Sequence, residues 1–188
     1  MEIVKIKKQG DKKILDKSVK IIKNGGVIIC PTDTIYGLIC DYKNKKSVNK
    51  VFKIKKRNKK KLLPVFVKDI KMAKKMALIS KEQEIILKKI WPGKITAVLS
   101  DKKGGKIGLR MPNYKFVLQL LNKTGRPLTA TSANISGRPG SGDIKKIAKQ
   151  FNNSKFQPDL IIDAGKLKRS KPSTVIDFTF NPPKILRP

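Results

Sequence analysis

The chain has 188 residues, of which 45 are basic and 13 acidic, giving a formal net charge of +32. This length is enough to bury a hydrophobic core, and it predicts a single domain over residues 1–188. No apolar stretch approaches the roughly 20 residues of a membrane span and the first residues lack the apolar core of a signal peptide, so we expect a cytoplasmic protein without membrane contact.

The first half of the chain alternates apolar runs with amphipathic segments. Asp16 is expected to cap a helix that runs to Asn24, before two glycines. Asn44 or Ser47 should open the next helix, which places basic residues at its C-terminal end. Asp69 and Ser80 are the expected caps of helices that reach Ala77 and Ile90, and strands are expected at residues 2–7, 26–30, 36–40 and 62–67.

The second half continues this alternation. The sequence Trp91-Pro92-Gly93 should break the preceding helix. Helices are expected at residues 114–123 and 143–151, and strands at 95–100, 107–110, 128–131, 160–163, 175–178 and 184–187. The expected fold class is therefore α/β, a twisted mixed sheet with flanking helices around a concave basic site.

The basic residues fall into two groups. Lysine accounts for 39 of the 45 and is spread along the chain, so most lysines are expected to be solvated, although together they attract anionic partners. The six arginines are more specific, because a planar guanidinium suits paired contacts with phosphate or carboxylate. Four of them lie in or beside the motifs described below and are the candidates for such contacts: Arg57, Arg110, Arg138 and Arg187.

Small polar residues follow two of the apolar runs. The sequence PTDTIYGL begins at Pro31, directly after an apolar run, and TSANISG begins at Thr131, after another. Such strand ends turn hydroxyls and backbone N–H groups toward a ligand, although the same residues are also common in ordinary turns. Each motif alone would be weak, but together they favour a binding site for a polar ligand.

Several kinds of chemistry are excluded. The chain contains no histidine, so a histidine base, a histidine metal ligand and a Ser-His triad are ruled out. It has no GxxxxGK[ST] loop, and its two cysteines, Cys30 and Cys40, lie in apolar runs and are expected to be buried thiols. We therefore predict no catalytic side chain and no protein-held metal, but a site that positions reactants and neutralises charge.

Six segments together resemble the YrdC/Sua5 family of threonylcarbamoyl-AMP synthases, in the same order along the chain. They cover almost the whole sequence, and they are PTDTIYGL, the K-x-R from Lys55 to Arg57 with Lys61 behind it, WPGKITAVL from Trp91, GLRMPN from Gly108, TSANISG and STVIDF from Ser173. The resemblance implies a short, single-domain, YrdC-like fold. It also implies synthesis of threonylcarbamoyl-AMP and pyrophosphate from L-threonine, bicarbonate and ATP, with Mg²⁺ expected to accompany the ATP.

The resemblance also assigns residues. It places Thr34, Arg110 and Ser173 around threonine, and it places Arg57, Lys61, Ser132, Asn134 and Arg187 around the nucleotide, with Lys55 as a further phosphate contact. Two departures from the family pattern stand out. Phe66 occupies the position where many members have a histidine near threonine, and the chain stops at Pro188, where the longer Sua5 type continues into a second domain.

The product of such an enzyme would pass to a separate tRNA threonylcarbamoyl transferase. The alternative hypothesis is a tRNA- or double-stranded-RNA-binding module without catalysis. Only 11 aromatic residues are scattered through the chain, which argues against stacking recognition of single strands. A carbamoyl-transfer module like that of the hydrogenase-maturation carbamoyltransferases is a third hypothesis, but their additional domains are missing from this sequence.

Overall fold

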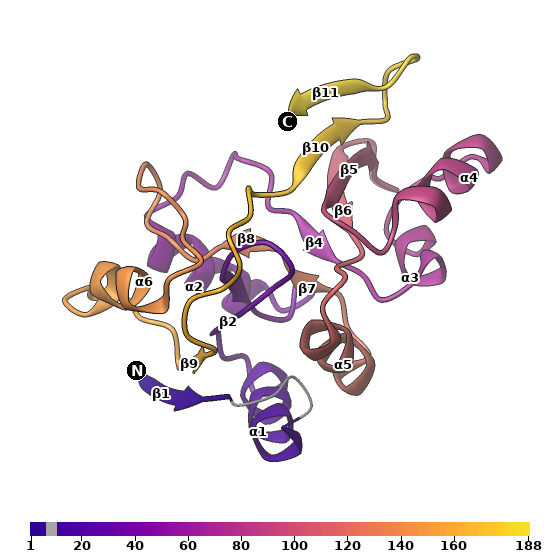
Figure 1. Cartoon of the computed structure of the whole chain (residues 1–188). Coiled ribbons are helices and arrows are strands. Elements are labelled where there is room, and N and C mark those ends of the chain that lie inside the picture. Colours follow the sequence, from indigo (N-terminus) through magenta and orange to yellow (C-terminus); the bar gives the residue numbers. More distant parts are fainter. Residues whose placement is uncertain (7–10) are drawn as a thin grey trace.

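The structure is a computed structural model that describes residues 1–6 and 11–188. Within these residues it contains six helices and eleven strands, which confirms the predicted mixed α/β class (Figure 1). The helices are α1 (Lys12–Lys23), α2 (Lys45–Lys55), α3 (Ile70–Lys74), α4 (Lys81–Ile90), α5 (Lys115–Thr124) and α6 (Ile144–Phe151). The strands are β1 (Glu2–Lys5), β2 (Ile28–Cys30), β3 (Gly37–Ile39), β4 (Val65–Phe66), β5 (Ile95–Ser100), β6 (Lys106–Arg110), β7 (Leu128–Thr129), β8 (Thr131–Ser132), β9 (Leu160–Asp163), β10 (Thr174–Asp177) and β11 (Lys184–Arg187).

The strands form two mixed sheets. The five-stranded sheet has the order β1-β9-β2-β3-β8, and the six-stranded sheet has the order β11-β10-β5-β6-β4-β7. The strand predicted at residues 128–131 divides at Ala130, so that β7 pairs with β4 in one sheet and β8 pairs with β3 in the other. At the division, the Ala130 N–H donates to the carbonyl of Pro64 (2.7 Å). This segment therefore joins the two sheets.

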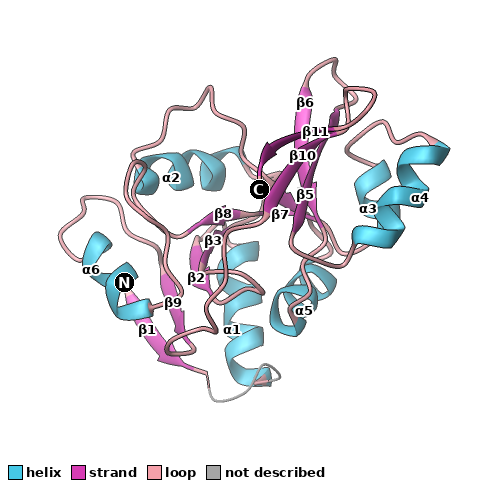
Figure 2. Cartoon of the chain, turned by 45° about the horizontal axis from the view of Figure 1, so that its top comes forward, coloured by secondary structure: helices cyan, strands magenta, loops and turns pink. Residues whose placement is uncertain are grey.

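Alternate residues of the five-stranded sheet face different helices, as the pleat of a strand requires. Ile28 and Cys30 pack in a cluster with α1 and α5, whereas Ile29 belongs to a cluster with α2 and α6. A third cluster, around Trp91, lies between α3, α4 and the six-stranded sheet. Figure 2 shows the three helix pairs around the two sheets. Both faces of the five-stranded sheet are covered, which explains its continuous apolar runs.

Most of the predicted helix starts are confirmed. The side chains of Asn44, Asp69 and Ser80 cap α2, α3 and α4, and Ser80 forms a capping box with Gln83. The prediction that Asp16 caps the first helix is wrong, because α1 begins earlier and Asp11 accepts from the Ile14 N–H (3.1 Å).

Some other predicted boundaries also change. Helix α3 ends at Lys74 instead of reaching Ala77, which bridges to Asp101. Strand β1 is described only to Lys5, and the predicted end at Lys7 lies outside the described residues. None of the helices in the described ranges is long and apolar enough to cross a membrane.

Both cysteines are free and buried, as predicted. Burial raises the pKa of Cys30 above its usual range and that of Cys40 to about 12. Neither thiol therefore ionises near neutral pH, which leaves both as packing residues.

Candidate functional site

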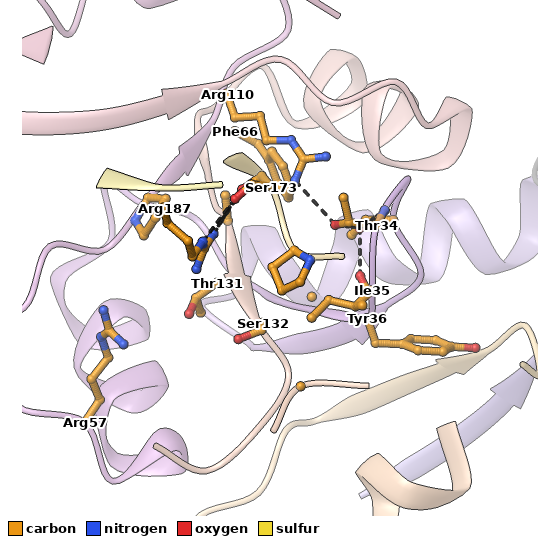
Figure 3. A pocket seen from close by; sticks show the side chains of 16 residues that line it. Thr34, Ile35, Tyr36, Arg57, Phe66, Arg110, Thr131, Ser132, Ser173 and Arg187 are labelled. Atoms are coloured by element: carbon orange, nitrogen blue, oxygen red, sulfur yellow. Dashed lines mark hydrogen bonds between the residues drawn. The ribbon is translucent and has the colours of Figure 1, made fainter. Parts of the chain in front are cut away.

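A cavity of about 300 Å³ lies where the two sheets meet (Figure 3). Its wall combines residues of the PTDTIYGL and TSANISG motifs with residues from the six-stranded sheet and the segment after α2. The lining residues are Thr32, Thr34, Ile35, Tyr36, Gly37, Arg57, Pro64, Phe66, Arg110, Ala130, Thr131, Ser132, Gly140, Pro172, Ser173 and Arg187. Six of the nine predicted site residues therefore line one cavity, although the sequence spreads them from Thr34 to Arg187.

Arg110, at the end of β6, forms one end of the cavity. Its Nη2 donates to Asp33 Oδ1 (2.6 Å), its Nε donates to the Gly93 carbonyl (2.9 Å), and its Nη1 lies 3.4 Å from Thr34 Oγ1. The side chains of Arg110 and Asp33 are only 5% and 7% exposed. Burial lowers the pKa of Arg110, while Asp33 raises it. The guanidinium is thus fixed in place, and it keeps N–H donors beyond these three bonds.

Phe66 lies beside this guanidinium. It pairs with Arg110 in the parallel register of β4 and β6, and the Arg110 Cζ atom is 5.7 Å from the centroid of its ring. Phe66 therefore offers an aromatic face to Arg110 instead of a hydrogen bond to a ligand.

Ser173 and Arg187 form a second group on the wall. Arg187, on β11, donates through Nη2 to the Ser173 carbonyl (2.6 Å) and through Nε to the same oxygen (3.1 Å). The Ser173 hydroxyl is 2.9 Å from that of Thr96 on β5. These contacts hold the start of β10 between β11 and β5, as the dashed lines in Figure 3 show for Arg187.

Arg57 lies at the other end of the cavity from Arg110 (Figure 3). It follows the left-handed Lys56 (φ 48°) that ends α2, and its Nη2 donates to the Leu62 carbonyl (3.1 Å). Its Nε is one of three buried side-chain polar atoms that have no hydrogen-bond partner within the described residues. Burial lowers the pKa of Arg57. The guanidinium therefore keeps N–H donors that are not used within the described residues.

The other three predicted residues do not line the cavity. Asn134 and Lys55 lie behind Ser132, where the Lys55 ammonium donates to the Asn134 carbonyl (2.9 Å). Lys61 is exposed, on the segment between α2 and β4. Their predicted contacts with the nucleotide stay predictions, and Arg138, a further candidate, also lies outside the lining.

Sequence reasoning missed two residues that organise the cavity. Asp33 holds Arg110, and its second oxygen accepts from the Asn113 N–H (3.0 Å). The hydroxyl of Tyr36 accepts from the Ala164 N–H (3.0 Å) and donates to the Gly165 carbonyl (2.8 Å). Tyr36 thereby anchors the start of the segment that carries Pro172 and Ser173 to the cavity. Both residues belong to the PTDTIYGL motif. Their roles could not be predicted from it, because their hydrogen-bond partners lie far away in the sequence.

The chemistry of the site follows from its donors. Guanidinium groups lie at both ends, hydroxyls lie between them, and the nearby carboxylate of Asp33 is already bound to Arg110. No group of three or more Cys, Asp or Glu side chains that could hold a metal occurs in the part of the chain that the structure describes. The cavity is therefore suited to hold two anionic groups close together.

Comparison with known proteins supports this interpretation. The model of the Sua5_yciO_yrdC family, which carries the description "Telomere recombination", matches residues 20–188. A relative from Methanocaldococcus jannaschii, a "Putative threonylcarbamoyl-AMP synthase", is 36% identical over 183 residues, which cover 94% of this chain and 86% of the relative. The threonylcarbamoyl-AMP synthase of Pyrococcus abyssi is 33% identical over 177 residues, covering 89% of this chain but only 51% of that longer protein.

Two solved structures share the fold closely. The crystal structure of P. abyssi Sua5 complexed with L-threonine has a TM-score of 0.91 at 29% identity, covering all of this chain and 57% of that one. The crystal structure of Escherichia coli YciO has a TM-score of 0.84 at 26% identity, covering 99% of this chain and 93% of that one. The chain belongs to the Sua5/YciO/YrdC family.

Proposed function

We propose that this protein is a threonylcarbamoyl-AMP synthase, a nucleotidyltransferase that joins L-threonine, bicarbonate and ATP and releases pyrophosphate. The observation that carries the proposal is the cavity itself, which has guanidinium groups at its two ends and hydroxyls between them. The names of the M. jannaschii and P. abyssi relatives support the same activity. The proposal takes residues 1–188 as one YrdC-like domain.

The end of the cavity at Arg110 is the proposed threonine site. A guanidinium with free donors beside it can bind the amino acid carboxylate, and Thr34 and Ser173 bring hydroxyls to the same wall. The P. abyssi structure holds L-threonine, which supports this class of substrate for a closely similar fold. Phe66 and Pro172 add apolar surface suited to the threonine methyl group.

The end at Arg57 is the proposed nucleotide site. Arg57, Ser132 and Arg187 face the cavity, and Lys61, on the exposed segment after α2, is a further predicted contact. In the proposed reaction, the threonine amine first adds carbon dioxide derived from bicarbonate and becomes a carbamate, and the proton that the amine loses leaves as water with the hydroxide of the bicarbonate. A carbamate oxygen then attacks the α-phosphorus of ATP, and pyrophosphate leaves. The cations offset the repulsion between these two anions, so binding and positioning supply the catalysis.

The proposal includes Mg²⁺ only as a companion of ATP. Asp33 is engaged by Arg110 and Asn113, and the described residues offer no cluster of carboxylates around the cavity. Mg²⁺ prefers oxygen ligands and commonly binds through substrate phosphates and water. Such an ion would therefore reach the site on the triphosphate, where it would neutralise charge on the phosphates.

The proposed partner for the product is a tRNA threonylcarbamoyl transferase, which would act with this enzyme in the cytoplasm. The net charge of +32 supports a second proposed property, weak binding of tRNA or double-stranded RNA. This property does not compete with the enzymatic proposal, because dispersed lysines can hold RNA while the cavity holds nucleotide and threonine.

The test is pyrophosphate release by the purified protein, with each substrate omitted in turn. We expect release only when ATP, bicarbonate and L-threonine are all present. Replacing threonine by valine, which lacks the hydroxyl, should strongly reduce release, because a hydrogen-bonding site rejects such an analogue. Arg110→Lys should raise the KM for threonine roughly tenfold or more, since an ammonium cannot reproduce the fork. Equal release without threonine, or with valine, would contradict the proposal.

A further inference from the structure

Lys55 is a buried lysine at the last position of α2. Lys55 is only 1% exposed, and its ammonium donates to the Ser132 carbonyl (2.5 Å), the Asn134 carbonyl (2.9 Å) and Asn134 Oδ1 (3.1 Å). An ammonium has three N–H donors. All three are therefore used within the protein, and none is left for a phosphate oxygen.

Asn134 is equally committed. Its Oδ1 accepts from Lys55 and from the Ser132 hydroxyl (2.5 Å), and its Nδ2 donates to the carbonyls of Ile135 (3.0 Å) and Arg138 (2.6 Å). These bonds use both lone pairs of the amide oxygen and both hydrogens of the amide nitrogen. Asn134 thus shapes the loop from Ser132 to Arg138 from inside and has no polar atom free for a ligand.

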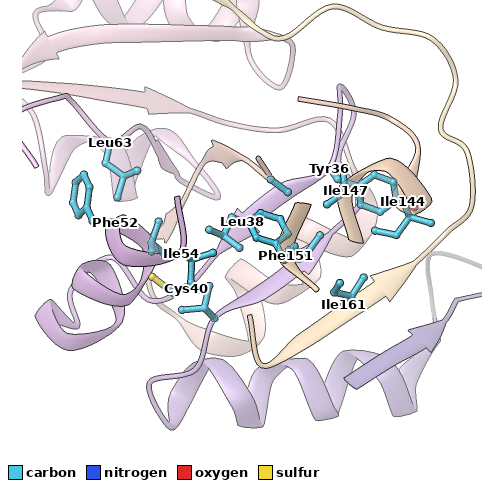
Figure 4. Close-up of a cluster of buried hydrophobic side chains, with 14 residues drawn as sticks. Tyr36, Leu38, Cys40, Phe52, Ile54, Leu63, Ile144, Ile147, Phe151 and Ile161 are labelled. Carbon is cyan, nitrogen blue, oxygen red and sulfur yellow. The ribbon is translucent and has the colours of Figure 1, made fainter. Parts of the chain in front are cut away.

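The backbone of Lys55 binds the same loop, because the Ser136 N–H donates to its carbonyl (2.7 Å). Helix α2 is itself fixed, since Ile54 and Phe52 pack in the cluster drawn in Figure 4. Lys55 therefore connects a helix that is held by the core to a loop that carries Ser132 on the cavity wall.

Arg57, two residues later, has the opposite character. It lines the cavity, it makes one hydrogen bond to the Leu62 carbonyl, and its buried Nε has no partner within the described residues. The turn at Lys56, in the left-handed region, separates the two side chains, so that one faces the loop and the other faces the cavity.

We propose that Lys55 is a positioning residue that holds the loop at Ser132–Arg138 in its binding conformation, and that Arg57 alone of this pair contacts the nucleotide phosphates. The positioning role stands on the contacts of the ligand-free chain, and its effect on ATP rests on the proposed function. Without the ammonium, the carbonyls of Ser132 and Asn134 lose a buried donor, and the loop should open to satisfy them with water.

The first test measures amide hydrogen exchange at residues 132–138 in the ligand-free protein. Lys55→Met keeps the unbranched apolar stem of the side chain, one atom shorter, and removes its donors, and exchange there should become roughly tenfold faster or more. Arg57→Met, the matched control, should leave exchange in the loop unchanged. Equal protection in the wild type and Lys55→Met would overturn the positioning role and leave the proposed function untouched.

The second test uses the wild-type protein and does not depend on the folding of a variant. Lysines are acetylated with and without ATP, and modification is measured at each position. A positioning Lys55 should be modified slowly in both conditions, because its amine is already enclosed. Rapid modification of Lys55 without ATP, with protection by ATP, would show a phosphate contact and overturn the proposal.

The third test is kinetic. Lys55→Met and Asn134→Ala should each raise the KM for ATP and leave the KM for threonine within about twofold, and the double variant should be no worse than the more affected single variant. If the two single effects on the KM for ATP multiplied in the double variant, the two residues would act independently, which would contradict a shared role through one loop. For the double variant Arg57→Lys with Lys55→Met, by contrast, we expect the two effects on the KM for ATP to multiply.

Discussion

The carboxylate of Asp33 holds the guanidinium of Arg110 across 77 positions of sequence, through a 2.6 Å ion pair that is almost completely buried. Asp33 belongs to the turn after β2, in the five-stranded sheet, and Arg110 ends β6, in the other sheet. The pair therefore spans the junction at which the cavity lies. It fixes the direction of the Arg110 fork and offsets the cost of burying its charge.

Asp33→Asn should destabilise the protein by about 3 kcal/mol, because removal of one partner leaves the other charge buried and unpaired. The measurement is the free energy of unfolding in urea. Asp16→Asn is the matched control, since its pair with Lys123 is 42–50% exposed and should contribute less than about 1 kcal/mol. Similar decreases in the free energy of unfolding in the two variants would show that the buried pair stabilises the protein no more than the exposed one.

Arg57→Lys should raise the KM for ATP roughly tenfold or more, which corresponds to about 1.4 kcal/mol. The charge is retained, but the ammonium lacks the planar arrangement of donors that the arginine offers to the cavity. Arg126→Lys makes the same chemical change outside the lining, where the arginine pairs with Asp41 (2.6 Å). Equal effects of the two substitutions on ATP would indicate that general charge, not a formed site, binds the nucleotide.

The stability should depend on pH through Lys55. Burial, and secondarily Arg57, lower its pKa to about 7 in the folded protein, against about 10.4 for an unfolded lysine. Between these values the unfolded chain binds more protons, so the free energy of unfolding should rise with pH, by up to about 1.4 kcal/mol per pH unit. Urea unfolding of the wild type and of Lys55→Met from pH 6 to 9 checks this. A difference between the two that stays constant with pH would contradict the lowered pKa.

Binding of tRNA should respond to salt and not to single residues. Lysines spread over the surface release counterions when they meet phosphates, so the affinity for tRNA should fall steeply as salt rises. Filter binding at several salt concentrations should give the same slope for the wild type and for the double variant Ser132→Ala with Asn134→Ala. Tight binding that resists salt and is lost in the double variant would instead place RNA recognition at the cavity.

Much of the fold was predictable because its signals are local. The side chains of Asn44, Asp69 and Ser80 stand directly before amphipathic runs, and each caps its helix as expected. The start of α1 was misplaced because the sequence offers two aspartates as caps, Asp11 and Asp16. The helix begins after Asp11, and its first turns include Leu15, which packs in the core. The division of residues 128–131 between two sheets was not predictable, since it depends on pairing with β3 and β4.

The candidate site was likewise predictable only in part. The motifs predicted Thr34, Arg110 and Ser173 as site residues, and the structure places all three on one cavity. The sequence cannot tell which donors remain free after folding. Lys55 has the side chain of a phosphate ligand, but its donors are consumed by Ser132 and Asn134, which are distant in the sequence.

The most direct measurement of the proposed activity follows the carbon of bicarbonate into the product. The protein is incubated in a sealed vessel with ATP, L-threonine and either ordinary or ¹³C-labelled bicarbonate, and the adenylate is analysed by mass spectrometry. We predict threonylcarbamoyl-AMP whose mass rises by one unit with the label, together with pyrophosphate. An adenylate whose mass does not change would mean that threonine reacts through its own carboxylate, and the absence of any adenylate would contradict the synthase assignment.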